Sequence, residues 1–153
     1  MRKMRKKNNK SCKQSGVIPY RLCDGKVEVL LITSRKRQSL VIPKGGICKG
    51  MTPPDSAAKE AWEEAGVVGQ VNTQKLGAYK YRKRGNIYQV HLFWLPVEKI
   101  LEDWPEASQR QRIWLDINHA AIIVKENSLK KILQNSQEQV RVFTSERLET
   151  HSF

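Results

Sequence analysis

A strand, a glycine-rich loop and a helix follow one another between residues 39 and 66, and this unit constrains the fold more than any other part of the chain. Residues 39–42 form a short β run that Pro43 stops. The loop over residues 44–50 contains three glycines. Thr52 is suited to cap a helix, Pro53 to begin it and Gly66 to end it. We therefore expect a helix over residues 53–65, entered from a loop whose backbone can approach a ligand closely.

Shorter strands and two hairpins surround this unit. Runs rich in β-branched and aromatic residues predict strands over residues 14–22, 27–33, 76–81, 87–97 and 113–115. Asp24-Gly25 and the basic segment 82–86 separate neighbouring runs and predict hairpin turns. Two further helices are expected, one over residues 119–123, opened by 116–118, and one over 128–137. The pattern is typical of an α/β domain.

The charge of the chain is large and unevenly spread. The 153 residues carry a formal charge of +13, which favours nucleic acid, phosphorylated small molecules or an anionic membrane surface as partners. Residues 1–13 hold seven basic side chains and no acidic one. We expect a disordered basic arm over 1–13, one domain over 14–138 and a C-terminal extension over 139–153.

Membrane-spanning and disulfide-rich classes are disfavoured. No apolar run approaches the 18 residues of a membrane span, and no apolar stretch follows the basic N-terminus as it would in a secretory signal. The three cysteines, Cys12, Cys23 and Cys48, are odd in number and far apart. This pattern favours a reducing compartment, and we expect the cytoplasm.

The expected helix carries an acidic cluster that stability alone would not select. Glu60, Glu63 and Glu64 lie three and four residues apart, which places them on one side of a helix. Like charges at this spacing cost about 0.2–0.5 kcal/mol per pair, and they face the negative end of the helix dipole. A solvated acidic face would have the same spacing. In a basic chain, however, three carboxylates beside a glycine loop favour a hard cation, Mg²⁺ or Mn²⁺, acting on a phosphoanhydride bond.

The run from Gly45 to Val67 resembles the Nudix box. The family pattern is matched by Gly45, Glu60, Glu63, Glu64, Gly66 and Val67, whereas Met51 replaces a glutamate, Lys59 replaces an arginine and Ala61 replaces a bulkier aliphatic residue. The resemblance implies an α/β/α sandwich around a mixed β-sheet, with a catalytic loop and helix. It also implies that Glu63 and Glu64 are the main metal ligands, that Glu60 is a further ligand or the catalytic base, and that the backbone carbonyl of Lys44 joins the metal shell. Met51 and Lys59 together imply the loss of an ion pair that braces the loop.

A second stretch narrows the resemblance. Residues 98–106, which contain Ile-Leu-Glu-Asp-Trp, and residues 110–115 are similar to the diphosphoinositol polyphosphate phosphohydrolases, a group that also cleaves diadenosine polyphosphates. Ser34-Arg35 matches a phosphate-contacting pair in that group. The resemblance implies a Mg²⁺-dependent hydrolase of phosphoanhydride bonds in nucleoside or inositol polyphosphate compounds.

Basic residues near these motifs are the expected phosphate contacts, because a guanidinium fork suits phosphate oxygens. Together with the glycine loop, the candidate substrate-binding residues are Arg35, Lys44, Gly45, Gly46, Arg82, Arg84, Arg110 and Arg112. Glu102 and Glu106 are alternatives for an additional acid at the metal site. Trp104 is expected to pack over the loop or to stack on a base.

Two other functions remain open from the sequence. The chain could bind RNA on a degenerate scaffold, or it could process RNA 5′ ends. The retained glutamates disfavour pure RNA binding, because acidic side chains add nothing to the affinity for RNA phosphates. A phosphorylated small molecule is therefore the favoured partner, nucleic acid is a disfavoured one, and the sequence sets no oligomeric state.

Overall fold

A mixed sheet of seven strands forms the centre of the computed structural model, which describes residues 11–136. The path of strands is β3-β2-β1-β7-β6, with β4 paired to β1 and β9 paired to β2. The strands are β1 (Ser11–Cys23), β2 (Lys26–Thr33), β3 (Leu40–Val41), β4 (Lys44–Gly46), β6 (Gly77–Lys83), β7 (Asn86–Pro96) and β9 (Arg112–Asp116). A separate pair joins β5 (Val67–Val68) to β8 (Lys99–Ile100).

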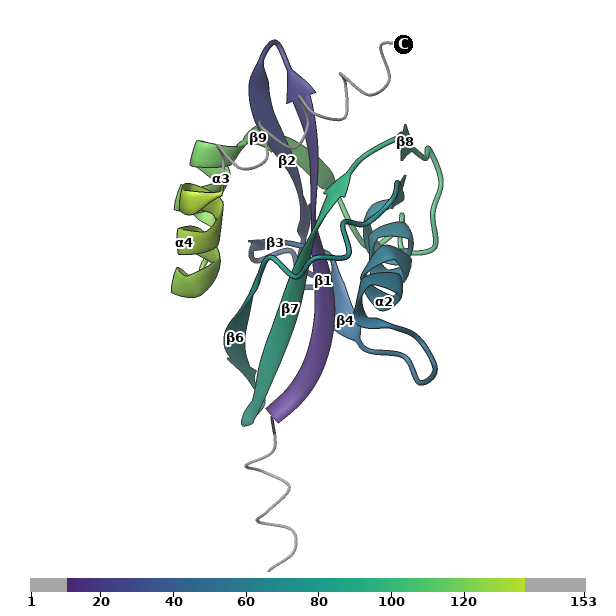
Figure 1. Cartoon of the computed structure of the whole chain (residues 1–153), viewed down its shortest axis with the longest axis vertical. Coiled ribbons are helices and arrows are strands. Elements are labelled where there is room, and N and C mark those ends of the chain that lie inside the picture. The colour runs from purple at the N-terminus through teal and green to yellow at the C-terminus, as the bar shows by residue number, and fades with distance from the viewer. Residues whose placement is uncertain (1–10, 137–153) are drawn as a thin grey trace, which may run out of the picture.

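Helices cover both faces of this sheet (Figure 1). On one face, α3 (Ile117–Ile123) and α4 (Asn127–Asn135) share a core with Ile18 and Tyr20 of β1. On the other face, α2 (Pro53–Glu60) packs over Val17. The alternation of strand side chains produces two cores, and the predicted α/β/α sandwich is confirmed.

Both predicted hairpins are confirmed. Asp24 and Gly25 have φ values of 52° and 76°, and Arg84 and Gly85 have 53° and 80°. Two consecutive left-handed residues form the turn that matches the twist of a two-stranded hairpin. The basic turn is shorter than expected, because residues 82 and 83 still belong to β6.

The predicted boundary of the basic arm is wrong by three residues. Residues 11–13 begin β1, where Lys13 pairs with Gln89 of the parallel strand β7. Parallel pairing joins segments far apart in the chain, so a local charge pattern does not reveal it. The remaining arm, 1–10, and the expected C-terminal extension lie outside the described residues. Within residues 11–136, none of the helices has the length and apolar character needed to cross a membrane.

The predicted helix over residues 53–65 changes type before it ends. Thr52 caps α2, its hydroxyl accepting the Asp55 N–H at 3.2 Å. From Ala61 the helix continues as one π-helical turn, η1 (Ala61–Ala65). The N–H of Gly66, which has a φ of 63°, donates to the carbonyls of Ala61 and Trp62. Glu63 and Glu64 therefore lie on a π turn, a feature often found at functional sites.

Candidate active site

A pocket of about 420 Å³ lies where β4, η1 and the loop before β9 meet. Its volume is in the range of small-molecule sites. Eight of its fourteen lining residues are charged. The acids are Glu60, Glu63, Glu64 and Glu106, and the bases are Arg35, Lys44, Lys83 and Arg110. The structure thus brings the three predicted glutamates together with three of the predicted cations.

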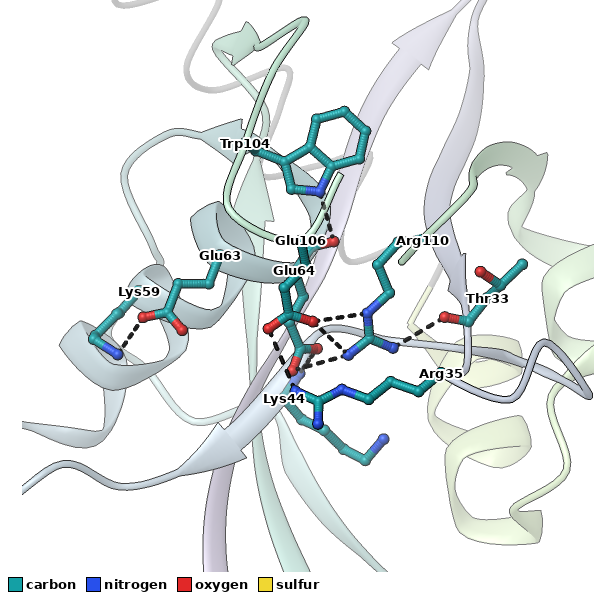
Figure 2. Close-up of polar contacts among 9 residues, drawn as sticks. All are labelled: Thr33, Arg35, Lys44, Lys59, Glu63, Glu64, Trp104, Glu106 and Arg110. Atoms are coloured by element: carbon teal, nitrogen blue, oxygen red, sulfur yellow. Dashed lines mark hydrogen bonds and ion pairs between the residues drawn. The ribbon is translucent and has the colours of Figure 1, made fainter. Parts of the chain in front are cut away.

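Glu64 is buried at the centre of the polar contacts (Figure 2). Its carboxylate accepts the backbone N–H of Lys44 at 3.1 Å and lies 3.4 Å from the Arg110 guanidinium. Burial raises its pKa to about 7, and these two partners only partly oppose that effect. A carboxyl group with a pKa near neutrality can exist in both protonation states during a reaction.

Glu60 is also buried, but it has a different environment. Among residues 11–136 its carboxylate makes no hydrogen bond and no ion pair. Burial, and to a lesser extent the charge of Glu63, raises its pKa. Because Glu60 lines the pocket and its carboxylate has no partner among the described residues there, its oxygens are available to a proton or a cation.

The backbone of Gly45 lies directly against this carboxylate. A methyl group built on Gly45 would overlap the carboxyl atoms of Glu60, whereas one built on Gly46 would meet nothing within 4 Å. The loop glycine is therefore required by close approach. This explains in contact terms why a glycine precedes the acidic helix.

A pair of alanine variants tests this contact. We expect Gly45→Ala to lower kcat about tenfold, because the new methyl group displaces the Glu60 carboxylate. Gly46→Ala is the matched control and should stay within about twofold of wild type, because its methyl group points into open space. Steady-state kinetics at saturating substrate measures both. Equal effects of the two variants would contradict the close-approach argument.

Glu63 points away from Glu64 and towards Lys59 (Figure 2). Its carboxylate forms an ion pair with Lys59 one helical turn earlier (Figure 2). The predicted loss of an ion pair at Lys59 is therefore offset locally, since the lysine has a partner within the helix. Within the described chain, no three acidic, histidine or cysteine groups lie close enough to hold a metal ion.

The donor set nevertheless suits a hard cation. Glu60 and Glu64 offer buried carboxylate oxygens in one pocket, and Glu63 lines the same pocket. Oxygen ligands of this kind are those that Mg²⁺ prefers. A metal site formed by all three requires Glu63 to leave Lys59. The metal shell, including the Lys44 carbonyl, stays a prediction.

Arg110 also lines the pocket, and its side chain is 6% exposed. It donates to Glu106 at 3.0 Å and to the backbone carbonyl of Thr33 at 3.0 Å. Glu106, one of the two candidate additional acids, also pairs with the exposed Arg35 at 3.6 Å. The other candidate, Glu102, is not among the residues that line the pocket.

Three predicted phosphate contacts lie elsewhere. Arg82, Arg84 and Arg112 do not line the pocket. Arg82 alternates with Tyr81 and Lys83 along β6, so it projects from the opposite face of the strand. Arg84 lies in the hairpin turn, and Arg112 binds backbone carbonyls behind η1. The prediction of Arg82 rested on its charge alone. The alternation of side chains along the strand would have identified Lys83 instead.

Tyr81 and Gln14 were also missed. The Tyr81 hydroxyl donates to Gln14 at 2.8 Å, and both residues line the pocket. The two residues are 67 positions apart in the chain, so only the pairing of β1, β7 and β6 brings them together. The Lys44 ammonium lies 5.1 Å from the Tyr81 ring centroid, and burial lowers the pKa of this lysine.

Comparisons with known proteins agree with this architecture. The NUDIX domain family model matches residues 13–136. Over 127 residues the chain is 39% identical to Nudix hydrolase 18, mitochondrial, of Arabidopsis thaliana, covering 77% of this chain and 72% of that protein. Over 101 residues it is 33% identical to diphosphoinositol polyphosphate phosphohydrolase 2 of Rattus norvegicus, covering 64% and 55%.

A solved structure shows the same fold. The C. elegans Ap4A hydrolase binary complex has a TM-score of 0.67 at 22% sequence identity, covering 80% of this chain and 93% of that one. At this identity the likeness concerns the arrangement of strands and helices. The sandwich and its loop-helix unit are thus shared with solved proteins.

Proposed function

This chain belongs to the Nudix family and is an acid-anhydride hydrolase, and from that premise we propose that it hydrolyses phosphoanhydride bonds of diphosphoinositol polyphosphate or dinucleoside polyphosphate compounds with Mg²⁺, or Mn²⁺, as cofactor. One observation carries the proposal. A single pocket holds two buried carboxylates, Glu60 and Glu64, together with four cationic side chains. Acids that suit a metal ion and bases that suit phosphates are the two parts that such a reaction needs.

The lining of the pocket favours the inositol type of substrate. Four cations can face several phosphate groups at once, as a densely phosphorylated ring requires. The one aromatic residue among those that line the pocket is Tyr81, whose ring is already stacked on Tyr88 at 5.0 Å. A nucleobase would need a free aromatic face for stacking. The name of the rat relative agrees with this preference.

The environment of each pocket side chain indicates its role in the proposed reaction. Arg110 is held in place by burial and by its contacts with Glu64, Glu106 and Thr33, and Lys44 lies beside the Tyr81 ring. Both therefore supply positive charge to the phosphates from fixed positions. Arg35 and Lys83 are more exposed and lie at the rim, where they can reach further phosphates. Glu60 is the proposed proton acceptor, because its carboxylate has no hydrogen-bonding partner within residues 11–136 and burial raises its pKa.

Glu63 and Glu64, with the Lys44 carbonyl, are the proposed metal ligands. When bound, Mg²⁺ would neutralise phosphate charge and lower the pKa of the attacking water. Glu64 is oriented for this role by the Lys44 N–H, which fixes one carboxylate oxygen. To bind the metal ion, Glu63 must break its ion pair with Lys59. The exposure of the lysine allows this exchange.

A substrate panel tests the proposal. Wild-type protein with Mg²⁺ is offered a diphosphoinositol polyphosphate, a dinucleoside polyphosphate and an RNA with a 5′-triphosphate. We expect the highest kcat/KM for the diphosphoinositol compound and complete loss of turnover in EDTA. Hydrolysis of the RNA alone would favour the 5′-end-processing alternative. No turnover of any compound by folded protein would overturn the proposal.

We also propose the cytoplasm as the compartment. Cys12, Cys23 and Cys48 are free thiols, as expected in a reducing environment. The Arabidopsis relative has "mitochondrial" in its name, so microscopy of the tagged full chain should compare the two compartments. Exclusive mitochondrial signal would overturn this part of the proposal.

A further inference from the structure

The segment 101–112 closes the C-terminal end of the helix that carries the glutamates. We call these residues the cap segment. The N–H of Glu106 donates to the Glu63 carbonyl at 3.0 Å, and the Trp104 indole N–H donates to the Glu64 carbonyl at 3.0 Å. The last carbonyls of a helix have no partner within the helix. Two of them, on the glutamates themselves, are therefore satisfied by the cap segment.

The next two carbonyls have partners in the same segment. Arg112 donates to the Ala65 carbonyl at 3.1 Å, and the Leu101 N–H donates to the Gly66 carbonyl at 2.8 Å. Arg112 also donates to the Leu101 carbonyl at 2.9 Å, so it ties the two ends of the cap segment together. Four consecutive carbonyls from Glu63 to Gly66 thus receive hydrogen bonds from one stretch of chain.

Trp104 and Arg112 form the centre of this cap. The Arg112 guanidinium lies 3.8 Å from the Trp104 ring centroid. The ring also lies directly on Gly66, where any Cβ atom would approach it to 2.7 Å. The positive charge of Arg112 is close to the negative end of the helix dipole, which opposes the repulsion among the nearby carboxylates.

The same segment supplies two pocket residues. Glu106 and Arg110 lie between Trp104 and Arg112 in the chain. Arg110 pairs with the Glu64 carboxylate on η1, and Glu106 pairs with Arg110. The cap segment therefore makes hydrogen bonds to the backbone carbonyls of the π turn and, through Arg110, also pairs with the Glu64 carboxylate. A shift of the cap segment or of the π turn would change the distance between Glu64 and Arg110.

We infer that Trp104 and Arg112 are positioning residues that set the metal-binding geometry of Glu63 and Glu64 by holding the π turn through its carbonyls. This inference rests on the proposed function, since it assigns those glutamates to a metal ion. It also gives one shared role to Trp104, which ends the Ile-Leu-Glu-Asp-Trp stretch, and Arg112, the second arginine of Arg-Gln-Arg.

The test compares Trp104→Phe and Arg112→Met with wild type. Trp104→Phe keeps a ring on Gly66 but removes the N–H that binds the Glu64 carbonyl. We expect the Kd for Mn²⁺, measured by calorimetry without substrate, to rise about tenfold and kcat to fall about tenfold, with KM within about twofold. Arg112→Met should act in the same direction, and Arg112→Lys, which keeps the charge but not the fork, should recover only part of the loss.

A second arginine–tryptophan pair in the same chain provides the control. The Arg21 guanidinium lies 4.1 Å from the Trp114 ring centroid, away from the pocket lining. Arg21→Met and Trp114→Phe should lower the unfolding midpoint without changing the Mn²⁺ Kd or kcat. If the cap variants behave like these controls, with wild-type Mn²⁺ affinity and kcat, the inference is overturned. Because Mn²⁺ affinity needs no substrate, failure of the substrate panel would not affect this readout.

Discussion

Glu64→Gln is expected to lower kcat about a thousandfold while the protein stays folded. The carboxylate is the one acid of the helix whose orientation is set by both a backbone donor, Lys44, and a buried guanidinium, Arg110. Glutamine keeps the volume but removes the charge that a metal ion requires. Loss of several kcal/mol of transition-state stabilisation corresponds to about three orders of magnitude in rate. Single-turnover kinetics with saturating Mg²⁺ measures the effect.

The same substitution should not reduce stability in metal-free buffer. Burial raises the pKa of Glu64 to about 7, so the folded chain holds this proton more tightly than the unfolded chain does. The resulting stabilisation is fully present below the unfolded pKa of about 4.5 and is lost as the pH rises through 7. Glutamine imitates the protonated form, so at pH 8 the unfolding midpoint of Glu64→Gln should equal or exceed that of wild type.

Glu28→Gln is the control for this prediction. Glu28 lies on β2 and pairs with Arg21 at 2.9 Å, and it is not among the residues that line the pocket. Its kcat should stay within about twofold of wild type. A Glu64→Gln variant that is as active as Glu28→Gln would show that this carboxylate has no part in the reaction.

Arg110→Met is expected to reduce both stability and activity. The substitution removes the cation beside two buried carboxylates, Glu64 and Glu106, and leaves the Thr33 carbonyl without this donor. Breaking a buried charged network costs about 3 kcal/mol at pH 8. The loss should be smaller at pH 5.5, because Glu64 can then take up a proton. We expect kcat/KM to fall by about 100-fold, since a preorganised phosphate contact is lost.

Arg35→Met is the matched variant, because Arg35 pairs with the same carboxylate of Glu106. Its side chain is 67% exposed, against 6% for Arg110. An exposed pair contributes less than about 1 kcal/mol, because water screens the charges. Chemical denaturation of the two variants at both pH values provides the comparison. Equal losses of unfolding free energy would contradict the assignment of the buried network to Arg110.

Local spacing predicted the elements that depend on neighbouring residues. Asp24-Gly25 formed the predicted hairpin turn, because only residues that tolerate positive φ suit it. Gly66 ended the acidic helix at the expected position for the same reason. The clustering of Glu60, Glu63 and Glu64 in one pocket also followed from their spacing.

Strand orientation and long-range pairing were harder to predict. Arg82 was assigned to the pocket by its charge, yet strand alternation turns Lys83 towards it instead. Residues 11–13 were assigned to the basic arm, yet they pair with a strand more than 70 positions later. The choice of Arg82 neglected the alternation of side chains along a single strand. The pairing of residues 11–13, by contrast, depends on hydrogen bonds made by another strand, which the residue types of the segment itself do not encode.

The sequence by itself determined which acids share one helical segment and where that segment ends, because these relations extend over a few residues. The structure decided which loop glycine lies against Glu60. Only the tertiary structure decided how those acids are held. The partners of Glu64 come from positions 20, 40 and 46 residues away, in Lys44, Trp104 and Arg110. Burial by these distant segments raises the pKa of the carboxyl group and turns an acidic helix face into a candidate active site.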